Sequence, residues 1–184
     1  MAILVDKIEL DRLVLRKFRP SDLDAFIEFR SHPDIYKYMI SAPKNSREEY
    51  ESSLMDIVNG YKRVNPIIKW AIELKSEHKV IGSVSIEHVY PKHDRCELGW
   101  SLNVSYQGHG YASEALKGLI DYIFTHTNMH RIHAFIWQGN DASCKLAERL
   151  GFQYEGTNIE ARKKDDKYID VLNYGLTRSM WEQK

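Results

Sequence analysis

The sequence Gln107-Gly108-His109-Gly110-Tyr111-Ala112 separates a strand pattern from a helix pattern. Before it, apolar and polar residues alternate from Cys96 to Val104, which is the period of a half-buried strand. After it, apolar residues recur at helical spacing from Ala112 to Ile123. A helix N-terminus has backbone N–H groups without intrahelical partners and carries a partial positive charge. The segment therefore predicts an anion site suited to phosphate or pyrophosphate, which glycines allow to approach the backbone closely.

Two other phosphate-binding loops are disfavoured by the residues around this segment. A P-loop requires Gly-Lys followed by Ser or Thr, which is absent here. A dinucleotide-binding fingerprint requires a third glycine three residues after Gly110, where Ser113 stands. Two glycines before a helix also occur in ordinary strand–helix turns. The segment alone therefore leaves the phosphate site and the plain turn open.

The flanking sequence predicts strands and helices on both sides of the glycine segment. Strand patterns cover residues 13–18, 68–74, 80–86, 96–104, 131–137, 152–161 and 168–176. Helix patterns cover residues 23–30, 46–60, 112–123 and 140–150, with predicted capping boxes at Ser21/Asp24 and Ser46/Glu49. The middle strands form an antiparallel meander, followed by one strand–helix–strand crossover. We therefore predict an α+β (mixed α/β) fold with a largely antiparallel seven-stranded sheet and about four helices.

Length and composition describe an ordinary globular protein. The chain has 184 residues without repeats or linkers, so residues 1–184 are expected to form one domain. Its 26 basic residues balance 26 acidic ones, which argues against binding of nucleic acid. The basic cluster 162–164 is followed by two aspartates and predicts a solvated turn.

The spacing of the cysteines and the hydropathy of the chain indicate whether a metal cofactor is expected and in which cellular compartment the protein is expected. The two cysteines match no metal-ligand spacing, so no metal is expected. The chain has no signal-peptide pattern and no apolar run of the roughly 20 residues that span a bilayer. These features predict a cytoplasmic protein without a membrane partner.

Two motifs together resemble the GNAT superfamily of N-acetyltransferases. Residues 107–112 match its Q/R-x-x-G-x-G/A signature. Asn140-Asp141-Ala142-Ser143, followed by Leu150-Gly151-Phe152, matches its second signature, N-x-x-S/A with a terminal Gly-Phe. Residues 97–102 and 13–22 look like the RimJ/RimL-like branch, which acetylates the N-termini of ribosomal proteins. The resemblance covers nearly the whole chain and implies the acyl-CoA N-acyltransferase fold.

The resemblance implies transfer of an acetyl group from acetyl-CoA, the co-substrate, to a primary amine. A protein N-terminal α-amine is the first choice of acceptor, and a polyamine or an aminoglycoside-like small amine is the alternative. A non-catalytic acyl-CoA-binding regulator is another alternative, because it would keep the phosphate loop without the chemistry. Relatives are often dimers, so a homodimer is expected.

The resemblance also implies which residues bind acetyl-CoA. Backbone amides at the start of the long helix would bind the pyrophosphate: Gln107, Gly108, His109, Gly110, Tyr111 and Ala112. Amides at the end of the preceding strand would contact the pantetheine arm and the acetyl carbonyl, where the strand splays from its neighbour: Leu102, Asn103 and Val104. Asn140 would reach the pantetheine arm and is also a predicted helix cap.

Acetyl transfer needs a neutral attacking amine, and an amine with a pKa of about 8–10 is mostly protonated at pH 7. A general base is therefore useful. Glu97 is the predicted base, acting through a water, because it points to the opposite face of its strand from Leu98. An exposed carboxylate without a catalytic role would show the same alternation along the strand. His88 and His133 are alternative bases.

The leaving thiolate needs a proton or a hydrogen-bond donor. Many superfamily members carry a tyrosine four residues after the N-x-x-S/A position, but Ala147 stands there. Ser143 is the predicted substitute as a donor to the cofactor sulfur, and its alternative role is support of the Asn140 cap. Cys144 adjoins it without a base partner, so covalent catalysis is not expected.

Overall fold

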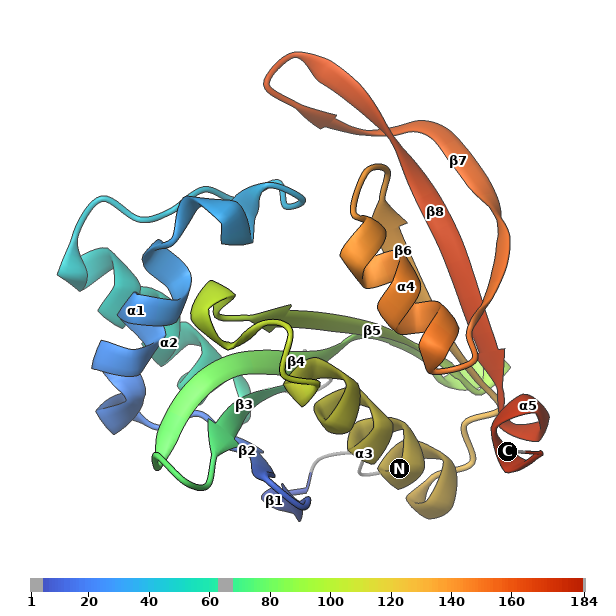
Figure 1. Cartoon of the computed structure of the whole chain (residues 1–184), viewed down its shortest axis with the longest axis horizontal. Helices are drawn as coiled ribbons and strands as arrows, with labels where there is room; N and C mark the ends of the chain where they lie inside the picture. Colours follow the sequence, from blue (N-terminus) through green and yellow to red (C-terminus); the bar gives the residue numbers. More distant parts are fainter. Residues whose placement is uncertain (1–4, 63–67, 184) are drawn as a thin grey trace.

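The computed structural model describes residues 5–62 and 68–183. One sheet of eight strands runs through these residues in the order β1-β2-β3-β4-β5-β6-β8-β7. Neighbouring strands are antiparallel except β5 and β6, which are parallel (Figure 1). The expectation of one domain over residues 1–184 stays a prediction, since residues 1–4, 63–67 and 184 lie outside the described residues.

The elements follow the predicted order closely. The strands are β1 (Lys7–Glu9), β2 (Leu13–Lys17), β3 (Ile68–Leu74), β4 (Lys79–Tyr90), β5 (Arg95–Leu102), β6 (Arg131–Trp137), β7 (Gln153–Lys164) and β8 (Lys167–Thr177). The helices are α1 (Leu23–Ser31), α2 (Arg47–Gly60), α3 (Tyr111–His126), α4 (Asp141–Arg149) and α5 (Arg178–Glu182). Short 3-10 helices include η1 (Pro20–Asp22), η2 (Pro33–Tyr36) and η4 (Val104–Tyr106).

Two short elements correct the expected count of seven strands and four helices. The strand β1 has 3 residues and the helix α5 has 5. Neither is long enough to show a hydrophobic period, so both were missed. β1 adds an antiparallel edge strand beside β2, and the predicted mixed α/β architecture with a largely antiparallel sheet is confirmed.

Different helices cover the two faces of the sheet (Figure 1). On β3, Trp70 and Ile72 pack in the core that includes α3, whereas Ala71 between them packs against α1 and α2. Successive residues of a strand point to opposite faces. The helix α4 joins the α3 core through Ala147. The sheet therefore has an α3/α4 face and an α1/α2 face.

One of the two predicted capping boxes is wrong. At α2, the Ser46 hydroxyl accepts a hydrogen bond from the Glu49 N–H at 3.3 Å, as predicted. At α1, no side chain caps the helix, which begins at Leu23 after η1. Asp22 accepts instead from the Arg19 N–H at 2.7 Å and from Arg16. The tertiary partner Arg16 therefore replaces the local cap.

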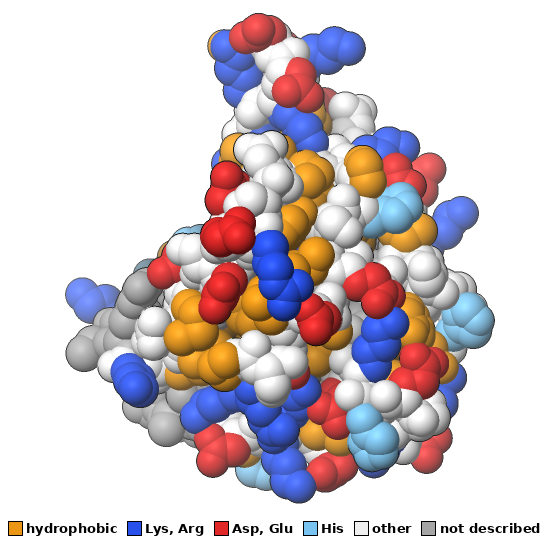
Figure 2. All heavy atoms as spheres, turned by 90° about the vertical axis from the view of Figure 1, so that its left-hand side faces the viewer, with side chains coloured by type: hydrophobic (Ala, Val, Ile, Leu, Met, Phe, Trp, Pro, Cys, Tyr) orange, Lys and Arg blue, Asp and Glu red, His pale blue; other side chains and the backbone are white. Residues whose placement is uncertain are grey.

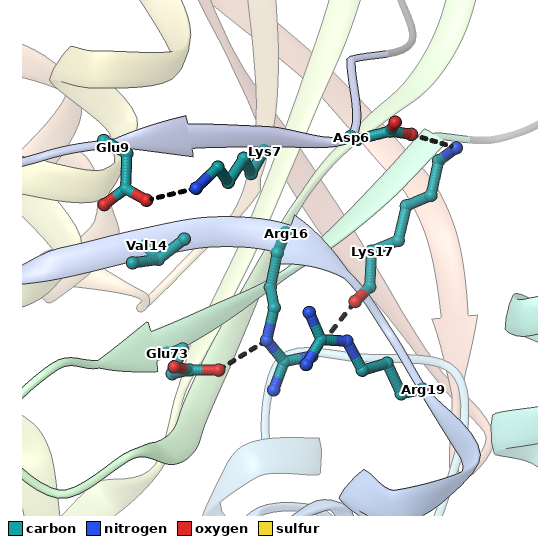
Figure 3. Close-up of a pocket in the computed structure, with 8 residues that line it drawn as sticks. All are labelled: Asp6, Lys7, Glu9, Val14, Arg16, Lys17, Arg19 and Glu73. Carbon is teal, nitrogen blue, oxygen red and sulfur yellow. Dashed lines mark hydrogen bonds and ion pairs between the residues drawn. The ribbon is translucent and has the colours of Figure 1, made fainter.

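A buried arginine fixes the entry of the chain into α1. The Arg16 guanidinium donates to both carboxylate oxygens of Asp22 at 2.8 Å and also pairs with Glu73 on β3. Figure 3 shows Arg16 and Glu73 in a hollow of about 410 Å³, where Lys7 pairs with Glu9 and Lys17 pairs with Asp6. These ion pairs account for most of the charges gathered there, although Arg19 also lines the hollow and forms no ion pair with a described residue.

The β7–β8 hairpin extends beyond the body of the molecule. Residues 165 and 166 form its turn, which places the basic cluster 162–164 at the tip. Figure 2 shows positive and negative side chains together on this projection. Lys163 pairs with Asp166 at 3.0 Å. The predicted solvated turn is therefore confirmed.

Candidate active site

The parallel strands β5 and β6 separate near the middle of the sheet. Their ladder joins only Arg95 with Arg131, Cys96 with Ile132 and Glu97 with His133. β5 continues to Leu102 and β6 to Trp137, and beyond Glu97 and His133 the two strands do not pair with each other. In Figure 1 they diverge between the start of α3 and α4. The splay that the resemblance implied is therefore present, and it begins directly after Glu97.

The start of α3 presents backbone donors without acceptors. Gly108 and the N-cap Gly110 have φ angles of 81° and 80°, in the left-handed region that favours glycine. The helical ladder begins with the Glu114 N–H, which donates to the Gly110 carbonyl at 3.0 Å. In the described chain, no group accepts a hydrogen bond from the N–H groups of residues 108–113. Together with the helix dipole, this donor set fits a diphosphate.

Two residues of the predicted cofactor set already use their backbone donors within the protein. The Gln107 N–H donates to the Val104 carbonyl at 3.2 Å, and its side chain donates to the Leu102 carbonyl at 3.2 Å. The Asn103 N–H donates to the Ile81 carbonyl at 2.8 Å. These bonds shape η4 and lead the chain from β5 into the glycine segment. The predicted pyrophosphate donors therefore start at Gly108.

Arg12 lies beside the glycine segment and was not predicted from the sequence. Its guanidinium donates to the His109 carbonyl at 3.0 Å and to Glu114 at 2.7 Å, and it stacks 4.6 Å above the Tyr111 ring. The Arg12 N–H also donates to Glu114 at 2.8 Å. Glu114 is in the first turn of α3, so its carboxylate lies at the same end of the helix at which a bound diphosphate would lie. Arg12 therefore neutralises a negative charge beside the candidate anion site.

We expect Arg12→Met to weaken CoA binding by about threefold to fivefold, because the unpaired Glu114 carboxylate would repel the diphosphate. Isothermal titration with CoA measures the change. Adding Glu114→Gln to the Arg12→Met background should recover most of the lost affinity. An Arg12→Met variant with wild-type affinity would contradict this electrostatic role.

The start of α4 carries the second sequence signature. The Asn140 side-chain oxygen accepts a hydrogen bond from the Ser143 N–H at 3.3 Å, so the predicted cap is confirmed. Within the described residues, the Ser143 hydroxyl has no hydrogen-bond partner, which leaves it available to a ligand. Ala147 is buried in the core, and its methyl side chain offers no proton donor to the sulfur. Burial raises the pKa of Cys144, which keeps it a thiol and not a nucleophile.

Glu97 lies at the last paired position before β5 and β6 separate. Its neighbours Cys96 and Leu98 face the α3 core, so Glu97 points to the α1/α2 face. Its carboxylate lies 3.1 Å from Nδ1 of His88 and 3.9 Å from Nε2 of His133. Burial raises the pKa of Glu97, and the neighbouring His88 partly opposes this effect. The structure thus gathers the predicted base and both alternative bases into one cluster.

A β-bulge explains why the sequence did not show this cluster. The β4–β5 register shifts between Ile86 and His88, which sets His88 directly opposite Glu97. His133 joins from β6 through the parallel ladder. Strand pairing and bulges depend on long-range register, which residue spacing along one strand does not reveal.

The segment after α1 crosses toward the other side of the splay. The Tyr38 hydroxyl donates to the Gly139 carbonyl at 2.6 Å, next to the start of α4. Lys164, at the tip of the β7–β8 hairpin, donates to the carbonyls of Tyr36 and Lys37. Figure 1 shows this loop and the hairpin approaching each other above the splayed strands. These contacts connect the segment after α1 with the start of α4 and with the tip of the hairpin.

A family model for the acetyltransferase (GNAT) domain matches residues 12–153. The chain belongs to this family and is an acetyl-CoA-dependent N-acetyltransferase, with acetyl-CoA as its co-substrate. Of the described residues, no three or more His, Cys, Asp or Glu side chains form a group that could hold a metal ion. In the same residues, no helix has the length and apolar character needed to cross a membrane.

Several named relatives match most of the chain. An uncharacterized N-acetyltransferase, p20 of Bacillus licheniformis, is 30% identical over 95% of this chain and 97% of its own length. A spermidine N(1)-acetyltransferase of Vibrio cholerae is 25% identical over 92% of this chain and 95% of its own length. The ribosomal-protein-serine acetyltransferase of Escherichia coli is 28% identical over 73% of this chain and 72% of its own length.

A solved structure shows the same fold. RimL, a ribosomal L7/L12 alpha-N-protein acetyltransferase in complex with coenzyme A, superposes with a TM-score of 0.82. It is 22% identical, and the match covers 93% of this chain and 97% of RimL. The resemblance to the RimJ/RimL-like branch is therefore supported by the sequence relatives, and the solved structure shows the shared fold.

Proposed function

We propose that this enzyme acetylates the N-terminal α-amine of a peptide or protein, with Glu97 as the general base. The observation that carries the proposal is the position of the Glu97 carboxylate, directly before the splay and on the face opposite α3. The free donors at the start of α3 would hold the cofactor along the splay. An amine arriving over the α1/α2 face would then meet the acetyl group between the separated strands.

Bound acetyl-CoA supplies an activated acetyl group as a thioester. Glu97 would accept a proton from the incoming amine through a water, because a protonated amine has no lone pair for attack. His88 holds the Glu97 carboxylate on one side at 3.1 Å and so orients it. The Val104 N–H, which has no acceptor within the described part of the chain, is a candidate donor to the pantetheine arm of the cofactor.

Ser143 would donate a hydrogen bond to the departing sulfur. We expect Ser143→Ala to lower kcat by about tenfold with unchanged CoA affinity, because a charge-assisted hydrogen bond to the developing thiolate is lost. Single-turnover kinetics and CoA titration measure the two effects separately. Unchanged kcat in the variant would limit Ser143 to its place in the α4 cap.

The acceptor side of the sheet favours a peptide over a polyamine. Arg95 and Arg131 precede Glu97 and His133 on the same strands, within the paired part of the ladder. Arg131 is paired with Glu155, so Arg95 is the guanidinium on these strands that would repel a polyamine, which carries several positive charges. The relatives include both a ribosomal-protein-serine acetyltransferase and a spermidine N(1)-acetyltransferase. We propose the first kind of acceptor and treat the second as its competitor. A homodimer and a cytoplasmic location stay predictions.

Release of free CoA thiol in the presence of acetyl-CoA tests the acceptor. Short peptides with free N-termini, the same peptides with blocked N-termini, spermidine and an aminoglycoside form the panel. We expect turnover with the free peptides and none with the blocked ones, because only the α-amine is attacked. Turnover with spermidine or the aminoglycoside, and none with the free peptides, would refute the proposed acceptor.

A further inference from the structure

A cavity lies on the sheet beside Glu97 and outside the splay. Its volume is about 290 Å³. The residues that line it come from the paired ends of β4, β5 and β6 and from the β7–β8 hairpin: Tyr90, Arg95, Arg131, His133, Phe135, Glu155, Asn158, Asn173 and Tyr174. His133 belongs both to this wall and to the Glu97 cluster, with its Nε2 3.9 Å from the Glu97 carboxylate. The cavity therefore lies next to the candidate base, with His133 between them.

The wall of the cavity contains buried polar atoms without partners. His133 is only 6% exposed, and its Nδ1 has no hydrogen-bond partner in the described structure. The Nε atom of Arg95 is likewise buried and unpaired among these residues. Buried polar groups are nearly always hydrogen-bonded, to protein, water or ligand. These two atoms leave hydrogen-bonding capacity beside the cavity that a water or a polar ligand would complete.

The charges of the cavity indicate the sign of that ligand. Arg131 forms an ion pair with Glu155, which cancels one positive charge. Arg95 stacks 4.5 Å above the Tyr90 ring and forms no ion pair with any described residue. Burial and the neighbouring arginine charges lower the pKa of His133 to about 4, so it is neutral near pH 7. Arg95 is therefore the guanidinium on this wall that forms no ion pair with a described residue, and it is the group that can bind an anion.

The backbone makes room for this arrangement. Gly175 on β8 lies opposite His133, and a Cβ added there would come within 2.2 Å of the Arg131 guanidinium and 2.4 Å of the Glu155 carboxylate. The absence of a side chain at Gly175 thus allows the Arg131–Glu155 pair to cross the sheet. With Glu155 bound to Arg131, Arg95 is the guanidinium left to face a ligand.

We propose that this cavity is a subsite for a carboxylate carried by the amine acceptor, with Arg95 as the residue that binds it. The inference rests on the proposed function, because it assumes that the acceptor amine reaches Glu97. Arg95 and Glu97 are two residues apart on one strand, which separates their Cα atoms by about 7 Å. An α-carboxylate lies too close to its own amine to span this distance. The side-chain carboxylate of a second-position glutamate lies at a suitable distance, so an N-terminus followed by Glu is the expected acceptor.

The test compares two peptides that are identical except for Glu or Gln at the second residue. We expect wild-type kcat/KM to be about tenfold higher for the Glu peptide, because a charge-assisted hydrogen bond forms with Arg95. Arg95→Met should remove this preference, while Arg95→Lys should retain part of it. Arg47→Met removes an exposed arginine on α2 and is the matched control that keeps the preference.

Equal kcat/KM values for the two peptides in the wild-type enzyme would overturn the subsite, and that comparison requires no variant to fold. A preference that survives Arg95→Met would overturn the role of Arg95. If neither peptide is acetylated, the proposed function fails. Calorimetric titration of both peptides into the CoA-bound enzyme then still tests the carboxylate subsite. Tighter binding of the Glu peptide, lost in Arg95→Met, would support the subsite, and equal affinities would overturn it.

Discussion

Glu97→Gln is expected to lower kcat/KM for acetyl transfer by about a hundredfold to ten-thousandfold, which is the usual contribution of a positioned general base. The amide keeps the shape of the side chain and can still contact His88, but it accepts no proton at neutral pH. CoA affinity should not change, because the Glu97→Gln substitution does not alter the glycine segment at the start of α3. Steady-state kinetics with the best acceptor and calorimetry with CoA measure the two quantities.

The pH dependence gives a second measurement of the same residue. Burial raises the pKa of Glu97, so the acid limb of the wild-type kcat/KM profile should lie above the ordinary carboxyl value of about 4.3. As the pH falls through this raised pKa, Glu97 becomes protonated and activity is lost. Glu97→Gln should lose that limb, whereas Glu182→Gln, an exposed carboxylate on α5, should keep it. An unchanged profile in Glu97→Gln would remove Glu97 from the mechanism.

The same pKa shift has a consequence for stability. A carboxyl whose pKa is higher in the folded protein than in the unfolded chain favours folding when protonated. That contribution is lost as the pH rises above the unfolded value. Near pH 7 the ionised, half-buried Glu97 therefore destabilises the fold. Glu97→Gln should raise the melting temperature near neutral pH and have less effect in acid, where both side chains are neutral.

Gly110→Val is expected to weaken CoA binding on the order of a hundredfold, by distorting the backbone donors to the diphosphate. Gly110 has a φ angle of 80°, a conformation that a β-branched residue rarely adopts. The chain should relax by turning the first N–H groups of α3 away from the anion. Calorimetric titration with CoA measures the loss, and thermal unfolding shows whether the rest of the molecule stays folded.

Gly60 supplies the matched control for this prediction. It ends α2 and lies far along the sequence from the glycine segment, and a Cβ added there would meet no heavy atom within 4 Å. Gly60→Val introduces the same side chain without strain at a positive φ angle, so CoA affinity should stay at the wild-type value. Equal effects of the two substitutions on CoA binding would show that the Gly110 conformation is unimportant for the cofactor.

Local patterns in the sequence predicted most of the secondary structure. The alternation around Trp70, Val84 and Leu98 gave three central strands, and the helical period after Ala112 gave α3. Gly60 and Asn140 marked a helix end and a helix start correctly. The failures, β1, α5 and the cap at Ser21, occurred where an element was too short for a period or where Arg16, a tertiary partner, replaced the local signal.

Sequence alone predicted the class of this protein, because the glycine loop at residues 107–112 and the second motif at residues 140–152 together resemble the two signatures of one superfamily. Each motif is a short local pattern, so it can be read without the tertiary structure. Tertiary structure decided what surrounds that loop. The β4 bulge and the parallel β5–β6 ladder bring His88 and His133 to Glu97, and the β1–β2 turn delivers Arg12 to α3. These contacts depend on the pairing register of strands that are distant in sequence. A slip of one residue would turn the side chains of a strand to the opposite face of the sheet.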